Sequence, residues 1–183
     1  MSDQELIKSC LAGNENAFRE LVKKYEPRVA ATVIGMLGNC PEADDVGQET
    51  FIRFYRSLQN FRGDSTIATY LTRIAINLSL NELKRRKRRS KFFFQTPENG
   101  KFDIPDESTK QPYSGEKEIV QRAIQKLDPN YRSIIVLRLI DGYSTEEAAA
   151  ILDIPIGTAL SRLSRAQKKL KEILMPYKEP REA

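Results

Sequence analysis

Residues 144–165 read STEEAAAILDIPIGTALSRLSR, and this stretch decides the fold of the C-terminal part of the chain. Ser144 and Glu147 have the S-x-x-E spacing of a capping box, which predicts a short helix over 146–152. The Asp-Ile-Pro that follows, at 153–155, predicts a tight connection. A longer basic helix then runs over 156–174. A short helix, a tight turn and a longer basic helix predict a helix-turn-helix.

The second helix of this motif has an apolar and a polar face. Its predicted inner residues are Leu160, Leu163, Leu170 and Leu174. Its outer residues near the N-terminal half are Thr158, Ser161, Arg162 and Arg165. A recognition helix meets base edges and phosphates at this place, so we expect contact with duplex DNA. An ordinary helical hairpin remains the alternative.

The rest of the chain also has helical spacing of its apolar residues. Helices are predicted over 15–37, 41–60, 67–90, 116–127 and 130–140. Gly63 breaks the pattern between two of them, and Ser65 or Thr66 is placed to cap the next helix. Residues 95–115 are rich in Pro, Gly and polar residues, which predicts a flexible linker. We therefore expect an all-α protein with two small helical domains, residues 1–94 and 116–183, joined by that linker.

Charge is unevenly distributed along the 183 residues, whose net charge is +5. Residues 82–91 contain seven Lys or Arg and one Glu, and a second basic cluster occupies 162–171. The acidic segment 42–49 has four carboxylates and no Lys or Arg. Two basic patches separated by an acidic linker indicate two contacts with a polyanion, although a solvated charged surface is the alternative.

Several chemistries are excluded or disfavoured by composition. The chain has no His, which excludes Ser-His-Asp and Cys-His nucleophile systems and imidazole metal sites. It has no Walker A motif, no apolar run long enough to span a membrane and no Cys-x-x-Cys pair among its two cysteines. We expect a cytoplasmic protein that is not an enzyme, with no cofactor, no metal and no membrane span of its own.

Four segments resemble one family, the extracytoplasmic-function (ECF, group four) sigma factors of bacterial RNA polymerase. They are 43–51 (ADDVGQETF), 60–65 (NFRGDS), 70–77 (YLTRIAIN) and 154–166 (IPIGTALSRLSRA). The resemblance implies a sigma region two domain that binds core polymerase and recognises and melts the −10 element, and a sigma region four domain that recognises the −35 element. It implies partners as well: the beta-prime clamp coiled coil and the beta flap of core RNA polymerase, promoter DNA and an anti-sigma factor.

The resemblance also assigns residues to each surface. For core-polymerase binding it implies Asp44, Asp45, Gln48, Glu49 and Phe51. For −10 DNA it implies Phe61, Arg62, Gly63, Asp64, Ser65, Tyr70, Arg73, Asn77, Asn81, Lys84, Arg85 and Arg88. For −35 DNA it implies Thr145, Gly157, Thr158, Ser161, Arg162, Arg165, Lys168 and Lys169. Core packing remains an alternative role for Phe61 and Tyr70.

The chain departs from the family pattern in region four. Leu160 stands where Lys or Arg is common, and Gln167 where Arg is common. We hypothesise that this factor relies on its −10 contacts, or on another protein, to find promoters. Two other classes remain open at this point: a stand-alone helix-turn-helix regulator, and a carboxylate-metal nuclease using Asp44, Asp45 and Glu49.

Overall fold

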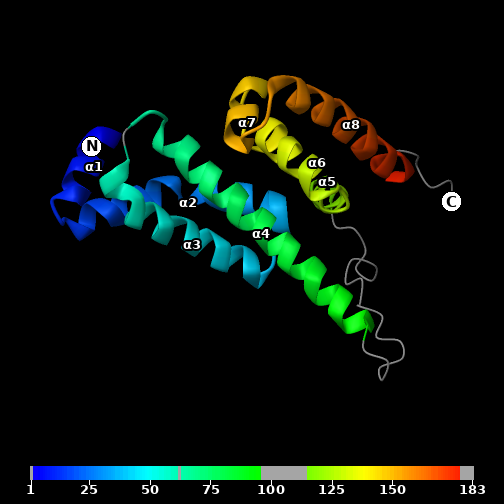
Figure 1. The fold of residues 1–183 in the computed structure, drawn as a ribbon, viewed down its shortest axis with the longest axis horizontal. Helices are drawn as coiled ribbons and strands as arrows, with labels where there is room; N and C mark the ends of the chain where they lie inside the picture. Colours follow the sequence, from blue (N-terminus) through cyan, green and yellow to red (C-terminus); the bar gives the residue numbers. More distant parts are fainter. Residues whose placement is uncertain (1, 62, 96–114, 178–183) are drawn as a thin grey trace.

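The computed structural model describes residues 2–61, 63–95 and 115–177, which form helices joined by short turns (Figure 1). The first group is α1 (Asp3–Leu11), α2 (Glu15–Leu37), α3 (Pro41–Ser57) with the 3-10 turn η1 (Leu58–Asn60), and α4 (Ile67–Gln95). The second is α5 (Glu116–Gln125), α6 (Pro129–Ile135) continued by the π-helical turn η3 (Val136–Ile140), α7 (Thr145–Leu152), α8 (Ile156–Leu174) and η4 (Met175–Tyr177). The predicted all-α fold with two helical domains is confirmed. The predicted linker falls almost entirely outside the described residues.

Helix α1 is the one described α-helix that was not predicted from the sequence. It begins with a capping box in which the Ser2 hydroxyl accepts from the Glu5 amide, and the Glu5 carboxylate accepts from the Ser2 amide. Asp3 holds α1 on α2, because its carboxylate accepts from Lys24 Nζ and from the Tyr25 hydroxyl, each at 2.6 Å. The S-x-x-E spacing at 2–5 was the signal that could have predicted this helix.

The N-terminal domain is a bundle built around α2. Its ends have local causes: the Asn14 side chain caps the first turn, and Gly38 ends the helix with a φ of 83°. Apolar residues three and four apart turn toward α3 and α4, and Leu21, Met36, Phe54 and Leu71 are fully buried. Helix α4 begins as predicted after Thr66, whose hydroxyl accepts a hydrogen bond from the Thr69 amide at 3.1 Å.

The C-terminal domain contains the predicted helix-turn-helix, formed by α7 and α8. The capping box of Ser144 and Glu147 is present, and Asp153 ends α7 in the left-handed conformation with φ 52° and ψ 51°. One packing prediction is wrong: Leu160 is 54% exposed and does not belong to the inner face. The buried face of α8 is formed by Ala159, Ala166 and Leu170. Leu160 follows Ala159 directly, so it is rotated about 100° away from that face.

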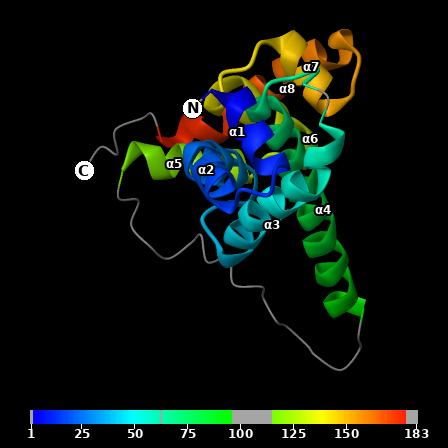
Figure 2. The ribbon, with the colours of Figure 1, turned by 90° about the vertical axis from the view of Figure 1, so that its left-hand side faces the viewer.

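The two domains pack directly against each other, which the sequence did not predict. Helix α2 contacts α5, α6 and η3, while α4 contacts α6 and α7 (Figures 1 and 2). Gly35 of α2 lies in this contact, where a Cβ atom would lie 3.0 Å from side-chain atoms of both Val136 and Ile140. The close approach of α2 and η3 therefore depends on this glycine.

Candidate polymerase and nucleic-acid interfaces

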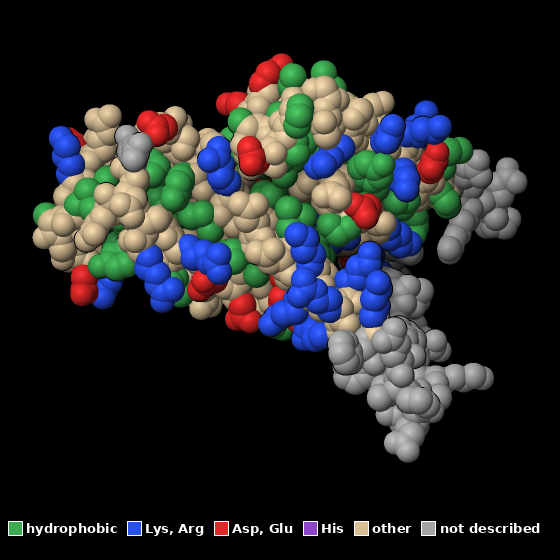
Figure 3. Space-filling view, in the orientation of Figure 1, with side chains coloured by type: hydrophobic (Ala, Val, Ile, Leu, Met, Phe, Trp, Pro, Cys, Tyr) green, Lys and Arg blue, Asp and Glu red, His purple; other side chains and the backbone are tan. Residues whose placement is uncertain are grey.

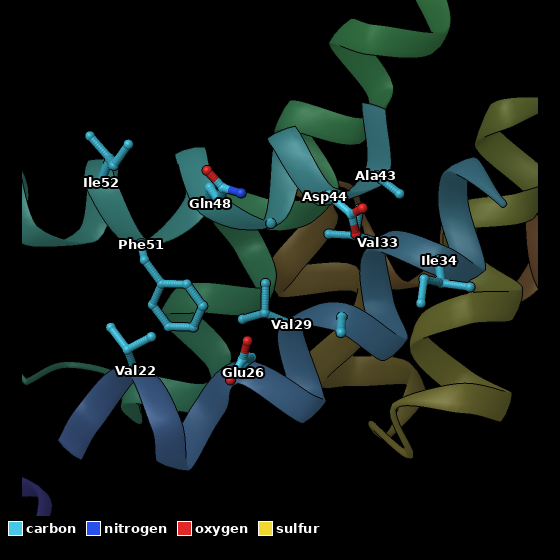
Figure 4. A pocket seen from close by; sticks show the side chains of 12 residues that line it. Val22, Glu26, Val29, Val33, Ile34, Ala43, Asp44, Gln48, Phe51 and Ile52 are labelled. Carbon is cyan, nitrogen blue, oxygen red and sulfur yellow. The ribbon is translucent and has the colours of Figure 1, made fainter. Parts of the chain in front are cut away.

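A groove of about 500 Å³ runs between α2 and α3 on the N-terminal domain (Figure 4). Its apolar wall consists of Val22, Val29, Val33, Ala43, Phe51 and Ile52. The carboxylates of Glu26 and Asp44 and the amide of Gln48 also line it. The groove therefore combines an apolar floor with an acidic rim, which suits an amphipathic helix carrying basic side chains.

Three of the five residues predicted to bind core polymerase line this groove, and two do not. Asp44, Gln48 and Phe51 line the groove together. Asp45 is exposed on α3 but does not line it, and the Glu49 carboxylate accepts from Arg53 Nε at 2.8 Å. The sequence reading missed the residues that α2 contributes. Their signal was the apolar spacing of 22–33 with Glu26 among the apolar residues.

Phe61 and Tyr70, predicted to contact −10 DNA, form an aromatic cluster with Phe54. The ring centroids of Phe61 and Tyr70 are 5.3 Å apart, and each lies within 6.0 Å of the Phe54 ring. Phe54 is fully buried, whereas Phe61 and Tyr70 are half-buried. Each of the two rings thus packs on the core and keeps some surface accessible.

The loop before α4 presents polar groups next to this cluster. Gly63 has a φ of 78°, a conformation that favours glycine, and Asp64 is exposed while Ser65 is half-buried. The predicted residue Arg62 lies outside the described residues. A turn with accessible polar groups beside two aromatic rings is a suitable place for an unstacked base.

Helix α4 carries one continuous polar stripe. The predicted residues Arg73, Asn77, Asn81, Lys84, Arg85 and Arg88 are all exposed and recur every three or four positions. Figure 3 shows Lys and Arg side chains gathered over the C-terminal half of this helix. Two members have other contacts: Arg85 pairs with Glu82 at 2.7 Å, and Arg73 Nη2 donates to the Ala150 carbonyl of α7 at 3.3 Å.

Arg86 belongs to the same basic run but has a different environment. Its guanidinium donates to the Leu37 carbonyl, to Cys40 Sγ and to the carboxylates of Glu42 and Glu82, at 3.1 to 3.4 Å. These contacts join α4 to the start of α3. Arg86 is therefore part of the structure of the bundle, unlike the exposed cations of the stripe.

A second hollow, of about 460 Å³, lies against α8. Five of the residues predicted to bind −35 DNA line it: Thr158, Ser161, Arg162, Arg165 and Lys169. The other three, Thr145, Gly157 and Lys168, do not line it. Three cations face one carboxylate here, that of Asp128, so the hollow favours a phosphate group.

Helix α6 and its N-cap residue contribute to this hollow, and the sequence analysis did not predict these residues. They are Asp128, Asn130 and Tyr131, and Lys169 Nζ lies 5.5 Å from the centre of the Tyr131 ring. The Asp128 side chain caps α6 by accepting from the Asn130 amide at 2.9 Å. The Asp-Pro-Asn sequence marks a helix start, but nothing local shows that this start lies beside α8.

Within the described ranges, no three His, Cys, Asp or Glu side chains are grouped so as to hold a metal ion. No helix in the same ranges has the length and apolar character needed to cross a membrane.

Comparisons with known proteins identify the family of the chain. The chain matches the sigma-70 region 2 family over residues 21–89 and the sigma-70 region 4 family over residues 117–170. It is 36% identical to the RNA polymerase sigma-H factor of Pseudomonas aeruginosa, over 95% of this chain and 94% of the relative. It is also 36% identical to the ECF RNA polymerase sigma-E factor of Escherichia coli (strain K12), over 96% of each chain.

Two solved structures have the same fold. CnrH, in complex with the cytosolic domain of CnrY, superposes with a TM-score of 0.68 at 26% identity, covering 97% of this chain and 99% of CnrH. The sigma factor RpoE of Bartonella quintana, in complex with the anti-sigma factor NepR, has a TM-score of 0.68 at 26% identity, covering 86% of this chain and 96% of RpoE. The predicted function is confirmed, since both helical domains match sigma regions and the relatives extend over nearly the whole chain. This chain belongs to the family of ECF RNA polymerase sigma factors, which are transcription initiation factors.

Proposed function

We propose that this sigma factor binds core RNA polymerase through the groove between α2 and α3, and that the rim residues Asp44 and Gln48 lie against the beta-prime clamp coiled coil. The observation that carries this proposal is the groove on the N-terminal domain, in which apolar side chains such as Val29 and Phe51 lie beside the carboxylates of Glu26 and Asp44. A partner helix with apolar and basic residues would bury its apolar side against Val29 and Phe51. Its basic side chains would meet Glu26 and Asp44, which adds specificity and speeds association.

The −10 element is held by the loop at 61–66 and by the polar stripe of α4. Phe61 and Tyr70 provide stacking surfaces, each worth about 1–3 kcal/mol per captured base. Flipping a base out of the duplex costs a few kcal/mol, and this capture offsets the cost. The protein itself catalyses no reaction, since promoter melting is driven by binding energy. It acts in the cytoplasm, where it meets polymerase and DNA.

The second domain contacts the beta flap and places α8 in the major groove of the −35 element. Arg162, Arg165 and Lys169 contact phosphates, while Thr158 and Ser161 reach base edges. Leu160 and Gln167 supply no charge at positions where the family commonly has a cation. This domain therefore binds the −35 element weakly when the protein is free, and recognition depends on the −10 contacts made in the same complex.

An anti-sigma protein controls access to these surfaces. The support comes from a relative, because the sigma factor RpoE of Bartonella quintana was solved in complex with the anti-sigma factor NepR. The groove between α2 and α3 suits such a protein for the same reason that it suits polymerase.

Co-purification with bacterial core RNA polymerase tests the core-binding site. The variant is Asp44→Lys/Asp45→Lys/Glu49→Lys, which reverses the acidic face of α3. The matched control is Glu116→Lys/Glu146→Lys/Glu172→Lys, because it changes the net charge equally at exposed positions of the second domain. We expect the wild type and the control to co-purify with core polymerase in equal amounts. The α3 variant should no longer co-purify with it.

Equal binding by all three proteins would contradict the proposed docking site. A wild-type protein that ignores core polymerase and shifts duplex DNA alone would contradict the proposed sigma function itself.

A further inference from the structure

Helix α8 has an apolar surface that is separate from the hollow it shares with α6. Ile156 and Leu160, on the first two turns of the helix, are 42% and 54% exposed. They are four positions apart, so their side chains lie next to each other on the helix surface. Neither residue lines the hollow between α6 and α8. The beginning of α8 therefore presents an apolar surface to solvent as well as a cationic one.

Leu160 projects from the solvent side of α8. The face that packs on the rest of the domain is formed by other residues, namely Ala159, Ala166 and Leu170. The exposed neighbours of Leu160 on the helix surface are all small: Gly157, Ser161 and Ser164. Leu160 is therefore the large apolar side chain among small ones on this part of the helix.

The space around Leu160 is open toward the start of the helix. Leucine side chains in helices point back toward the N-terminus, so Leu160 lies over Gly157 and Ile156. A Cβ atom at Gly157 would meet nothing within 4 Å, so no other segment of the described chain covers this place. A leucine has no hydrogen-bond donor or acceptor, so it pairs neither with a phosphate nor with a polar base edge. The partner that suits Leu160 is an apolar group.

The cations of α8 indicate how this apolar surface meets DNA. Three of them line the hollow on the opposite flank and favour phosphate groups: Arg162, Arg165 and Lys169. When one flank of a recognition helix contacts the backbone, its exposed face meets base edges in the major groove. Ser161, next to Leu160, donates its hydroxyl proton to the Thr158 carbonyl at 3.0 Å and keeps its oxygen as an acceptor. The exposed face of α8 thus offers base edges an acceptor and an apolar group.

The major groove contains one kind of apolar group at its base edges, the C5 methyl group of thymine. The other base-edge groups are hydrogen-bond donors and acceptors, and a leucine placed against them would remove their water without replacing it. Contact between Leu160 and a thymine methyl group takes apolar surface of both out of water. Leu160 therefore favours thymine and disfavours the other three bases at the position it faces.

We propose that Leu160, supported by Ile156, determines sequence specificity in the −35 element by contacting the C5 methyl group of a thymine. This inference rests on the proposed function, because it uses the placement of α8 in the major groove of the −35 element. It adds an apolar contact to the base contacts of Thr158 and Ser161.

Selection of DNA by the holoenzyme tests the base preference. The probe is a pool of duplexes randomised across the −35 and −10 elements. The control for Leu160→Ala is Leu11→Ala, which shortens a leucine of α1 that is 51% exposed. We expect the wild type and the control to enrich thymine about three- to fivefold at one −35 position. Leu160→Ala should lose this preference and keep the preferences at the other positions.

Deoxyuridine tests the contact at the level of one group, because it lacks only the C5 methyl group of thymine. When deoxyuridine replaces the selected thymine, the wild-type holoenzyme should bind about three- to fivefold more weakly. Leu160→Ala should bind the two duplexes equally, since the partner of the methyl group is already missing. Leu160→Arg should not distinguish them either, although its added charge strengthens binding to both.

An equal loss on deoxyuridine substitution in the wild type and in Leu160→Ala would overturn the proposal. A selected −35 element without a thymine preference on either strand would contradict the role of Leu160 and leave the proposed function intact. Co-purification of the same proteins with core polymerase reports on that function separately. A wild type that binds core but selects no −35 bases would contradict the placement of α8 itself.

Discussion

Arg86 and Arg88 are two positions apart in the basic run of α4, yet they have different roles. Arg86 contacts Glu42, Glu82, Cys40 and the Leu37 carbonyl, and it joins α4 to α3. Arg88 is exposed. Composition treats the two residues as equal, whereas the structure assigns one to stability and leaves the other accessible to DNA.

We therefore expect the two alanine variants to affect different properties, namely stability for Arg86 and DNA binding for Arg88. Arg86→Ala should lower the free energy of unfolding by about 1–2 kcal/mol, because several partly buried hydrogen bonds to charged groups are lost. Arg88→Ala should change it by less than about 0.5 kcal/mol, as is usual at an exposed position. It should instead make the slope of log affinity against log salt less negative by about 1, since one phosphate contact is removed. Urea unfolding and salt titrations of promoter binding by the holoenzyme measure the two effects, and equal behaviour of the variants would refute the distinction.

At the scale of elements, α8 combines three kinds of surface. Its buried face packs on α5, α6 and α7, its cations line the hollow shared with α6, and Ile156 and Leu160 are apolar and exposed on its first two turns. The exposed Leu160 explains why this helix has less positive charge near its N-terminal half than the family pattern suggests.

Leu160→Arg should restore the missing cation at little cost to folding, because the side chain is 54% exposed. We expect tighter binding of the holoenzyme to promoter DNA and a salt slope more negative by about 1, from one additional phosphate contact. Gln167→Glu serves as a control that adds charge of the opposite sign to the same helix, and it should weaken binding. No change in slope with Leu160→Arg would mean that this flank of α8 does not approach the DNA backbone.

At the scale of the whole molecule, Asp141 couples the domain contact to pH. Burial raises its pKa from the ordinary value of 3.8 to about 6, although the Thr32 hydroxyl and the Arg28 charge act in the opposite direction. With the domains apart, the carboxyl is solvated and returns to its ordinary pKa. The closed form, in which the two domains are in contact, then binds the proton more tightly than the form with the domains apart. The extra stability of the closed form is therefore fully present below about pH 4 and is lost as the pH rises through 6.

Lowering the pH from 7.5 to 5.5 should therefore favour the closed form of the free protein. We expect a gain on the order of 1 kcal/mol, after allowance for solvent screening of a group that is only partly buried. In the wild type, the radius of gyration from small-angle scattering should decrease as the pH is lowered. Asp141→Asn, which is neutral throughout, should be closed at both pH values. A wild type and an Asn variant with the same pH dependence would show that another group is responsible.

The sequence by itself determined the helices and the family. Periodic apolar residues, the cap at Ser144 and the left-handed Asp153 act within a few residues of the chain, so α2, α7 and α8 begin and end close to the predicted positions. The motifs at 43–51 and 154–166 likewise identified two sigma regions without any tertiary information. The capping box before α1 carried the same kind of local signal, and only the apolar spacing failed to reveal that helix.

Only the tertiary structure decided which of these residues meet. Arg28 and Asp141 are 113 positions apart, and Arg73 and Ala150 are 77 apart, so no local spacing indicates their contact. The same holds for Asn130 and Tyr131 beside α8, and for Arg86 against the start of α3. Helix periodicity defines a face but does not name the surface that covers it. For that reason the closure of the two domains follows from packing between distant segments and not from any motif.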